Sequence, residues 1–454
     1  MTLLYTAYDI VRRATRPMYQ LLDAGQKLAR DEYNPLRNTT AMKTMAGLWE
    51  LQARALKTYA KPRYLVWEHL GDLEIELEEQ VVQSLPFADL LRFPMPGSEG
   101  QPKVLIAAAL SGHHATLLQD TVRGFAQDFD TYITDWKDAR TVPAEAGRFG
   151  FDDYVEYLIS FLETLGPGTH VVATCQAAPP AMVATAIMSM RGSPCTPVSL
   201  TLMGGPVDTR LSPNNVLDKI TTTIPLKWFK RLNIHKVPKG FPGAGRRVYP
   251  GFLQLNGFMT MNPVPHVKQH YRFLKNSIKG DDGALEKFRD FYDEYFAVLD
   301  MAEDFYVETL ERVFFDQHIA KDKMLFRGEK VDFKAIQDTA LLTVEGANDN
   351  FCPPTQTEAA HDVCSGVPEE KRGHYIQPGV GHYGVFSGSK FQAEIYPVIR
   401  DFIQKSIAAM PKDKVAKAPP KPKRDLPARK KGPVRPGKAQ HHPEGSEFAD
   451  IPFV

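Results

Sequence analysis

The sequence predicts an α/β fold in which a mostly parallel, doubly wound sheet lies between layers of helices. Two observations carry this prediction. Short apolar runs of strand length alternate with helical segments from about residue 86 to 203, and the same alternation resumes from 340 to 410. More than a hundred residues of helical and aromatic pattern separate the two stretches, as expected for a cap inserted over the active edge of the sheet.

Residues 1–70 are expected to form a helical N-terminal region. Apolar residues such as Leu4, Ala7 and Val11 recur at helical spacing, with Arg12 and Arg16 interleaved. The pattern is that of an amphipathic helix. Such a helix either packs on the main domain or docks on an apolar, lipid-like partner.

Residues 71–410 are expected to form the main domain, with the cap at about 208–336. The expected strands are 104–110, 132–135, 169–173, 198–203, 340–344 and 373–376. The expected helices are 116–129, 151–165, 180–190, 355–363 and 391–410. Each strand is a short apolar run followed by a loop and a helix, which is the order that a parallel sheet requires.

Residues 411–454 read as a disordered basic tail rich in proline and lysine. The tail holds 11 Lys and Arg against 5 Asp and Glu, a net charge of +6; the whole chain has +1, which leaves −5 for the rest. Such a segment buries too little apolar surface to offset the entropy lost on ordering. It either solubilises the protein or tethers it to an anionic surface.

Several classes of function find no support in the sequence. The four cysteines form no CxxC pair and no metal-ligand spacing, so neither a disulfide framework nor a zinc site is expected. Asp281-Asp282-Gly283 lacks the further ligands of a calcium loop and reads as a turn. No phosphate-binding glycine motif follows a strand, and no apolar run reaches membrane length. We therefore expect a soluble, unexported protein without cofactor, metal, nucleic acid or transmembrane segment.

Cys175 stands where the strand at 169–173 meets a helix that opens with Pro179 and Pro180. A sharp turn between a strand and a helix exposes a nucleophile, provided that small residues flank it. Alanines at 173 and 177 fill the two positions where glycine is usual. Taken alone, the pentapeptide fits a buried structural cysteine equally well.

Two further loops at strand ends carry the partners that a cysteine nucleophile needs. Asp349 follows the strand at 340–344, and His382 follows the strand at 373–376. The order nucleophile, acid, histidine is that of the α/β-hydrolase fold, which we therefore predict. Asp208 is the reserve acid, and Asp349 could instead cap a turn with its neighbouring asparagines.

Each of these residues has an expected role in acyl transfer. His382 would take the thiol proton of Cys175 and return it to the leaving group, while Asp349 would orient the imidazole. The backbone N–H groups of Gln176 and Gly112 are the expected oxyanion donors. His113 and His114 are expected to pack in the loop around Gly112 rather than to act as a second base.

Three segments, 170–177, 345–354 and 377–388, give the chain a resemblance to intracellular poly(3-hydroxybutyrate) depolymerases, which are cysteine-type α/β-hydrolases. The resemblance extends from the N-terminus to about Met410. It implies hydrolysis of stored polyester granules to 3-hydroxybutyrate and oligomers in the cytoplasm, at the granule surface. In that family Cys175, Asp349 and His382 would take the positions of the catalytic triad.

Two alternatives stay open at the level of sequence. Polyhydroxyalkanoate synthases use the same three residue types on the same fold, although they usually carry Gly-x-Cys-x-Gly where this chain has alanines. A non-catalytic protein that coats granules through its helices and basic tail is the other alternative. The sequence leaves the oligomeric state, the product size and the choice between hydrolysis and thiolysis by coenzyme A open.

Overall fold

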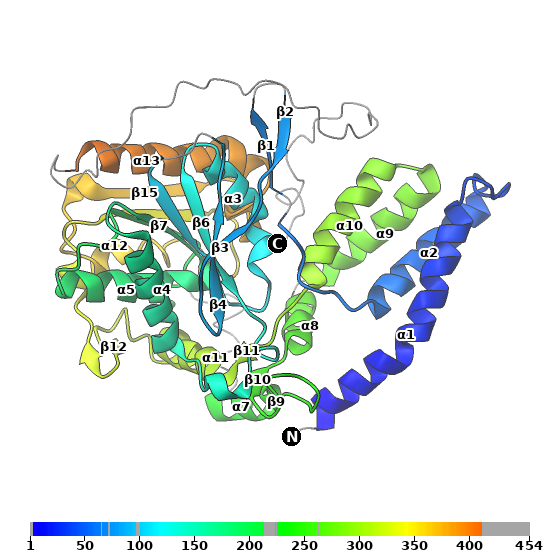
Figure 1. The fold of residues 1–454 in the computed structure, drawn as a ribbon, viewed down its shortest axis with the longest axis horizontal. Helices are drawn as coiled ribbons and strands as arrows, with labels where there is room; N and C mark the ends of the chain where they lie inside the picture. The colour runs from blue at the N-terminus through cyan, green and yellow to red at the C-terminus, as the bar shows by residue number, and fades with distance from the viewer. Residues whose placement is uncertain are drawn as a thin grey trace.

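A computed structural model describes residues 3–410, apart from 65, 71–72, 97–99, 213–222, 224 and 262. The tail predicted at 411–454 lies outside the described residues. A central sheet is flanked by helices, and a helical arm stands away from this body (Figure 1). Within the described part of the chain, no helix combines the length and the apolar character needed to cross a membrane.

The largest sheet has eight strands in the order β15-β14-β8-β7-β5-β6-β4-β3. Neighbours pair in parallel from β15 to β6, whereas β4 pairs antiparallel with both β6 and β3. This order is that of the α/β-hydrolase fold, which confirms the predicted fold class. The strands are β3 (Gln80–Ser84), β4 (Ala88–Phe93), β5 (Lys103–Ala107), β6 (Asp130–Trp136), β7 (His170–Thr174), β8 (Ser199–Met203), β14 (Ala340–Gly346) and β15 (Arg372–Gln377).

Helices cover both faces of this sheet (Figure 1). α3 (Gln119–Ala126) and α13 (Tyr396–Ala408) pack together on one face, and α4 (Phe151–Leu165) packs with α5 (Ala178–Met190) on the other. The central strands β7, β8 and β14 are buried along their whole length, as strands covered on both faces must be. Every residue of α5 from Ala178 to Met188 is buried, so this helix forms part of the core.

The prediction of a helix at 355–363 is wrong for the first half of this range, because α12 is confined to Ala360–Val363. The buried carboxylate of Glu345 explains the difference. It accepts hydrogen bonds from the backbone N–H groups of Thr355, Thr357 and Glu358 at 2.8–3.2 Å. These N–H groups therefore need no helical partner, and Thr355 takes a φ of 84°, outside the right-handed helical region.

The strands β3 and β4 are absent from the sequence-based prediction. β3 lies at the sheet edge, and its burial pattern is almost entirely exposed. An edge strand of this kind shows no strong apolar signal. β4 pairs antiparallel with β3 and is mostly buried, with Asp89 and Arg92 partly exposed.

The insertion between β8 and β14 forms the cap, and its aromatic residues divide into two groups. One group packs into a separate small core of α9 and α10, made of Phe273, Phe288, Phe291, Tyr292 and Tyr295 with Leu285. The other group faces the sheet. The cap contains α7 (Leu226–Asn233), β9 (His235–Lys236), β10 (Arg247–Tyr249), α8 (Gly251–Met261), α9 (Pro263–Lys279), α10 (Asp282–Phe296), β11 (Met301–Ala302), α11 (Glu303–Thr309), a π-helical turn (Leu310–Phe315), β12 (Leu325–Phe326) and β13 (Glu329–Lys330).

The N-terminal helices α1 (Leu3–Arg30) and α2 (Thr40–Leu56) pack against each other and join α9 and α10 in the arm of Figure 1. The start of α1 is fixed to the cap. Tyr5 donates a hydrogen bond to the buried carboxylate of Asp300, and the ring of Tyr8 stacks on Phe252 of α8 at 3.9 Å between centroids. A short hairpin of β1 (Trp67–Leu70) and β2 (Leu73–Glu76) follows the arm.

The contact between the cap and the loop after β5 contains a carboxyl group with a perturbed pKa. Thr116 donates a hydrogen bond of 2.8 Å to Glu294 of α10. Burial raises the pKa of Glu294 to about 7, against the smaller lowering effect of the Thr116 hydroxyl. The pKa of Glu294 is higher in the folded protein than in the unfolded chain, so the folded protein holds this proton more tightly. The free energy of unfolding therefore decreases as the pH rises toward 7.

We expect Glu294→Gln to unfold at a higher temperature than the parent protein at pH 8 and at a similar temperature at pH 5. The gain in free energy of unfolding at pH 8 should be about 1 to 2 kcal/mol, since the amide removes the cost of burying a charge. Thermal unfolding at the two pH values measures it. Glu286→Gln on the exposed side of α10 is the control; an equal gain in both variants would contradict the explanation.

Candidate active site

Cys175 occupies a sharp turn between β7 and α5. Its φ of 50° lies in the left-handed region, which non-glycine residues rarely adopt. A short 3-10 turn, Cys175–Ala177, leads directly into α5, where proline at the first helical positions costs no hydrogen bond. This geometry is the strand-turn-helix elbow that presents a nucleophile. The thiol is partly exposed, unlike the buried Cys352 and Cys364.

The space that this elbow needs comes from the neighbouring strand end. A Cβ on Gly205 would overlap the Cβ of Ala178 and lie 3.1 Å from the carbonyl oxygen of Cys175. Gly204 has a φ of 54°, and a side chain there would contact Asp349 and His382 at 3.5 Å. The Gly204-Gly205 pair after β8 thus makes room for all three predicted residues. The predicted strand at 198–203 ends just before this pair, but the sequence pattern does not reveal the packing role of the two glycines.

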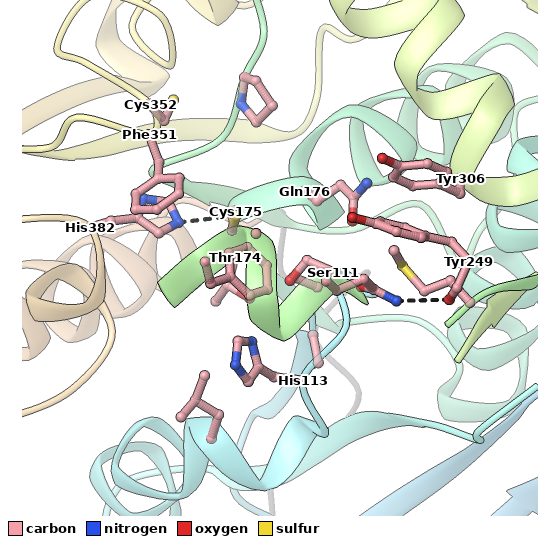
Figure 2. Close-up of a pocket in the computed structure, with 18 of the residues that line it drawn as sticks. Ser111, His113, Thr174, Cys175, Gln176, Tyr249, Tyr306, Phe351, Cys352 and His382 are labelled. Carbon is pink, nitrogen blue, oxygen red and sulfur yellow. Dashed lines mark hydrogen bonds between the residues drawn. The ribbon is translucent and has the colours of Figure 1, made fainter. Parts of the chain in front are cut away.

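The structure brings the side chains of Cys175, Asp349 and His382 together. The Nδ1 of His382 lies 2.7 Å from a carboxylate oxygen of Asp349, and its Nε2 lies 3.1 Å from the Sγ of Cys175 (Figure 2 draws the second contact). The other oxygen of Asp349 accepts from the backbone N–H groups of Phe351 and Cys352, both at 2.9 Å. Asp349 therefore orders a turn and also contacts the imidazole.

The charges around His382 favour its protonated form. Burial lowers the pKa of His382, but the charges of Asp349 and Cys175 and the hydrogen bonds to both residues outweigh burial, so the pKa is raised well above its ordinary value. A protonated imidazole beside the sulfur stabilises a thiolate. The arrangement can hold a nucleophilic sulfur next to a proton donor.

Asp208, His113 and His114 make other contacts. Arg210 binds the Asp208 carboxylate with two hydrogen bonds of 2.7 and 2.8 Å. Burial lowers the pKa of His113 to about 4 and that of His114 to about 3, so both are neutral at pH 7. The ring of His113 stacks on Phe258 of the cap at 5.1 Å between centroids.

The loop after β5 is held in place by the cap. Gly112 has a φ of 107°, and a Cβ there would overlap the buried carboxamide of Gln254. The Gly112 carbonyl accepts a hydrogen bond of 2.8 Å from the N–H of Leu299. Gln176 and Ser111 line the same cavity as Cys175. The assignment of the Gln176 and Gly112 N–H groups as oxyanion donors stays a prediction.

Cys175 opens into a cavity of about 550 Å³ between the sheet edge and the cap. Figure 2 shows Tyr249 and Tyr306 on the wall beside Gln176, with Phe351 beside His382. None of the described residues that line the cavity is lysine, arginine, aspartate or glutamate. Its apolar lining, which sequence reasoning did not assign, includes Phe229, Leu232, Leu253, Phe258, Met301, Tyr306, Leu310, Phe314, Phe351, Tyr383 and Phe386.

One cluster among the described residues has the composition of a metal site. Glu345, Glu358 and His374 place one possible ligand atom each within 4.8 Å of one another. The three backbone N–H groups that bind Glu345 already account for its burial. The cluster therefore has a structural explanation at the end of β14.

Residues 204–407 match the family model described as PHB de-polymerase C-terminus. The matched part contains Asp349 and His382. Cys175 and the loop after β5 lie before it.

Two curated proteins are similar over shorter stretches. The poly(3-hydroxyalkanoate) polymerase subunit PhaC of Haloferax mediterranei is 25% identical over 165 residues, 36% of this chain and 32% of that protein. The protein of the same name from Haloarcula marismortui is 27% identical over 147 residues, 32% of this chain and 30% of that protein. The alignments thus span about a third of the length of these relatives.

Solved structures with the same general architecture are distant in sequence. A monoacylglycerol lipase of Paleococcus ferrophilus is 10% identical with a TM-score of 0.42, covering 70% of this chain and 98% of that chain. A thermophilic esterase from Thermogutta terrifontis is 12% identical with a TM-score of 0.38, covering 73% and 99%. The assignment of the α/β-hydrolase fold here rests on the strand order of the sheet itself.

We expect Asp349→Asn to slow the alkylation of Cys175 by iodoacetamide at pH 7 by about tenfold or more, because the charge that raises the pKa of His382 is lost. Mass spectrometry of the labelled peptides follows each cysteine separately. Burial raises the pKa of Cys364 to about 12, so that thiol should stay unlabelled. Asp208→Asn is the matched control, and an equal loss of labelling in this variant would refute the assignment.

We expect Gly205→Ala to lower the free energy of unfolding by about 1 to 3 kcal/mol, since the new methyl group overlaps Ala178 beneath the elbow. Adding Ala178→Gly to the same chain should recover most of the loss. Denaturant unfolding of the single and double variants measures the coupling. Gly283→Ala, where an added Cβ has only one neighbour at 3.9 Å, is the control; purely additive effects would contradict the proposed overlap.

Proposed function

We propose that this chain hydrolyses the ester bonds of stored polyhydroxybutyrate through a thioester on Cys175, and that it works at the surface of polyester granules in the cytoplasm. The observation that carries the proposal is the position of Cys175, 3.1 Å from His382, at a cavity whose described lining residues include no aspartate, glutamate, lysine or arginine. A polyester chain is uncharged along its length and fits such a lining. The similarity of residues 204–407 to the PHB de-polymerase C-terminus supports the same substrate class.

The reaction begins with the thiolate of Cys175 and the protonated imidazole of His382. The sulfur attacks the ester carbonyl carbon, and the resulting oxyanion is stabilised by N–H donors, for which Gln176 and Gly112 are our candidates. Collapse of this intermediate breaks the bond between carbon and alkoxide oxygen. His382 gives its Nε2 proton to the departing alkoxide, which leaves as a hydroxyl-ended product.

Water completes the cycle. Neutral His382 takes a proton from the water molecule as its oxygen attacks the thioester carbon. The bond from carbon to sulfur then breaks, which releases a carboxylic acid and restores the thiolate beside the imidazolium. Asp349 keeps the Nδ1 proton in place through both halves, because it accepts that hydrogen bond at 2.7 Å.

A synthase is the second candidate, favoured by the names of the two curated relatives. In that reaction the acyl group enters from a coenzyme A thioester, and the hydroxyl end of a growing chain replaces water. The same Cys175 and His382 would serve both directions of acyl transfer. The absence of Lys, Arg, Asp and Glu from the described cavity lining, together with alanines 173 and 177, makes hydrolysis our first choice.

We expect the full chain to release 3-hydroxybutyrate from amorphous poly(3-hydroxybutyrate) particles, and Cys175→Ala to lose at least about a thousandfold of that rate. Mass spectrometry of the intact protein after brief exposure to substrate should show an acyl adduct, absent from the variant. Cys195→Ala, at a partly exposed cysteine away from the elbow, is the control. Polymer and free coenzyme A from 3-hydroxybutyryl-CoA, without release of monomer from particles, would establish the synthase instead.

A further inference from the structure

The arm carries an apolar stripe on α1 that faces solvent. Leu4, Val11, Met18, Leu21 and Leu28 follow one another at intervals of seven or three residues, a helical three-four spacing, and each is 50–68% exposed. Such spacing places residues on one side of a helix. An isolated exposed leucine needs no explanation, but five in a single row across the whole helix do.

Two more helices of the arm expose the same pattern. On α2, Met45 and Leu48 are exposed. On α9, the exposed residues Val264, Val267 and Tyr271 repeat at the same three-four spacing. The stripes on α1 and α2 hold no charged residue, and the Lys27–Asp23 salt bridge lies on another side of α1. On α9, exposed Lys275 lies four residues after Tyr271, and exposed Lys268 follows Val267.

The three stripes share the outer face of the arm. α2 lies between α1 and α9 and runs antiparallel to both, as shown by Arg12 bonding the Leu56 carbonyl and Ser277 bonding the Lys43 carbonyl. On α2 the opposite side faces α10, where Glu50 binds Arg289. Since α1 and α9 both run antiparallel to α2, helical geometry places their apolar stripes on the same outer side as the stripe of α2.

We propose that this outer face of α1, α2 and α9 docks on the uncharged surface of the solid polyester, so that the enzyme stays bound while its cavity cleaves chains. This inference rests on the proposed function. At helix spacings of about 10 Å and a length of about 25 Å, three helices make a face on the order of 600 Å², large enough to mark an interaction site. The absence of charge from the stripes of α1 and α2 matches a surface of methyl and ester groups.

A second copy of the chain fits this face less well. Stable protein interfaces need about 800 Å² on each partner and polar groups that fix the register. The heptad positions of α1 between its large residues hold Ala7, Ala14 and Gly25, which are poor knobs for a coiled coil. An amorphous polymer surface has no fixed register, so binding to it requires neither large residues at these positions nor polar groups that fix a register.

The arm is also fixed to the wall of the cavity. Tyr8 of α1 stacks on Phe252 of α8, and α8 supplies Leu253 and Phe258 to the cavity lining. α9 follows α8 in the same insertion. A chain region held by the outer face would therefore lie at a fixed distance from Cys175, which raises the effective concentration of ester bonds at the site.

The test compares charge added to the outer face with equal charge added elsewhere on the arm. The first variant is Val11→Glu with Met18→Glu on α1, and the second is Val267→Glu with Tyr271→Glu on α9. The matched control is Gln20→Glu with Ala24→Glu, at exposed positions on the other side of α1. Binding to amorphous poly(3-hydroxybutyrate) particles is measured by co-sedimentation with Cys175→Ala added to every chain. Hydrolysis of soluble p-nitrophenyl butyrate is measured with Cys175 intact.

We expect each outer-face variant to weaken particle binding by about tenfold or more and the control to change it by less than about twofold. Soluble ester hydrolysis should stay within about twofold in all three, which shows that the body is folded. Unchanged particle binding in both outer-face variants would overturn the proposal. A shift from dimer to monomer in light scattering would assign the face to a second copy, and equally tight binding to phosphatidylcholine vesicles would assign it to lipid.

Failure of the docking proposal can be told apart from failure of the proposed function. If the parent chain releases 3-hydroxybutyrate from particles while the outer-face variants bind as tightly as the parent, only the docking proposal fails. If the parent binds particles through this face and releases no monomer, the hydrolytic function fails while docking stands.

Discussion

The parallel pairing of β7 between β5 and β8 is the constraint on which the rest of the site depends. Because these buried strands end at one edge, the turn at Cys175, the loop of Gly112 and the glycines 204 and 205 all meet there. The left-handed backbone of Cys175 would be unfavourable in an isolated peptide. This backbone conformation is held by β7 on one side and by the buried helix α5 on the other, so the packing of the sheet offsets its conformational strain.

The strand-end residues could be predicted because each depends on a local pattern. A short strand followed by a turn marks where a parallel strand delivers its next residue. This placement, together with the chain order nucleophile, acid, histidine, selected Cys175, Asp349 and His382. Contacts between distant segments could not be read in the same way. The overlap that makes Gly205 necessary involves Ala178, and the loss of helix after Asp349 depends on the buried Glu345, which no periodicity reveals.

The cap shows that one composition can serve two purposes. Its aromatic residues divide between a small core within the cap and the lining of the cavity. Rings on α9 and α10 bury one another in a small core of their own, which holds these two helices together. Rings and aliphatic side chains on α7, α8 and α11 face Cys175 instead. Whether a ring joins the small core or lines the cavity depends on which side of its helix faces the sheet.

The strand order separates residues 204–407, which match the family model, from most of the central sheet. A cut at residue 204 separates β8 from β14, although these strands are hydrogen-bonded neighbours along five residue pairs. The piece from 204 to 407 would keep two strands of the eight and expose the buried face of β14. It is a stretch of related sequence rather than a folding unit, and Asp349 and His382 cut off with it would have neither Cys175 nor the rest of the sheet beside them.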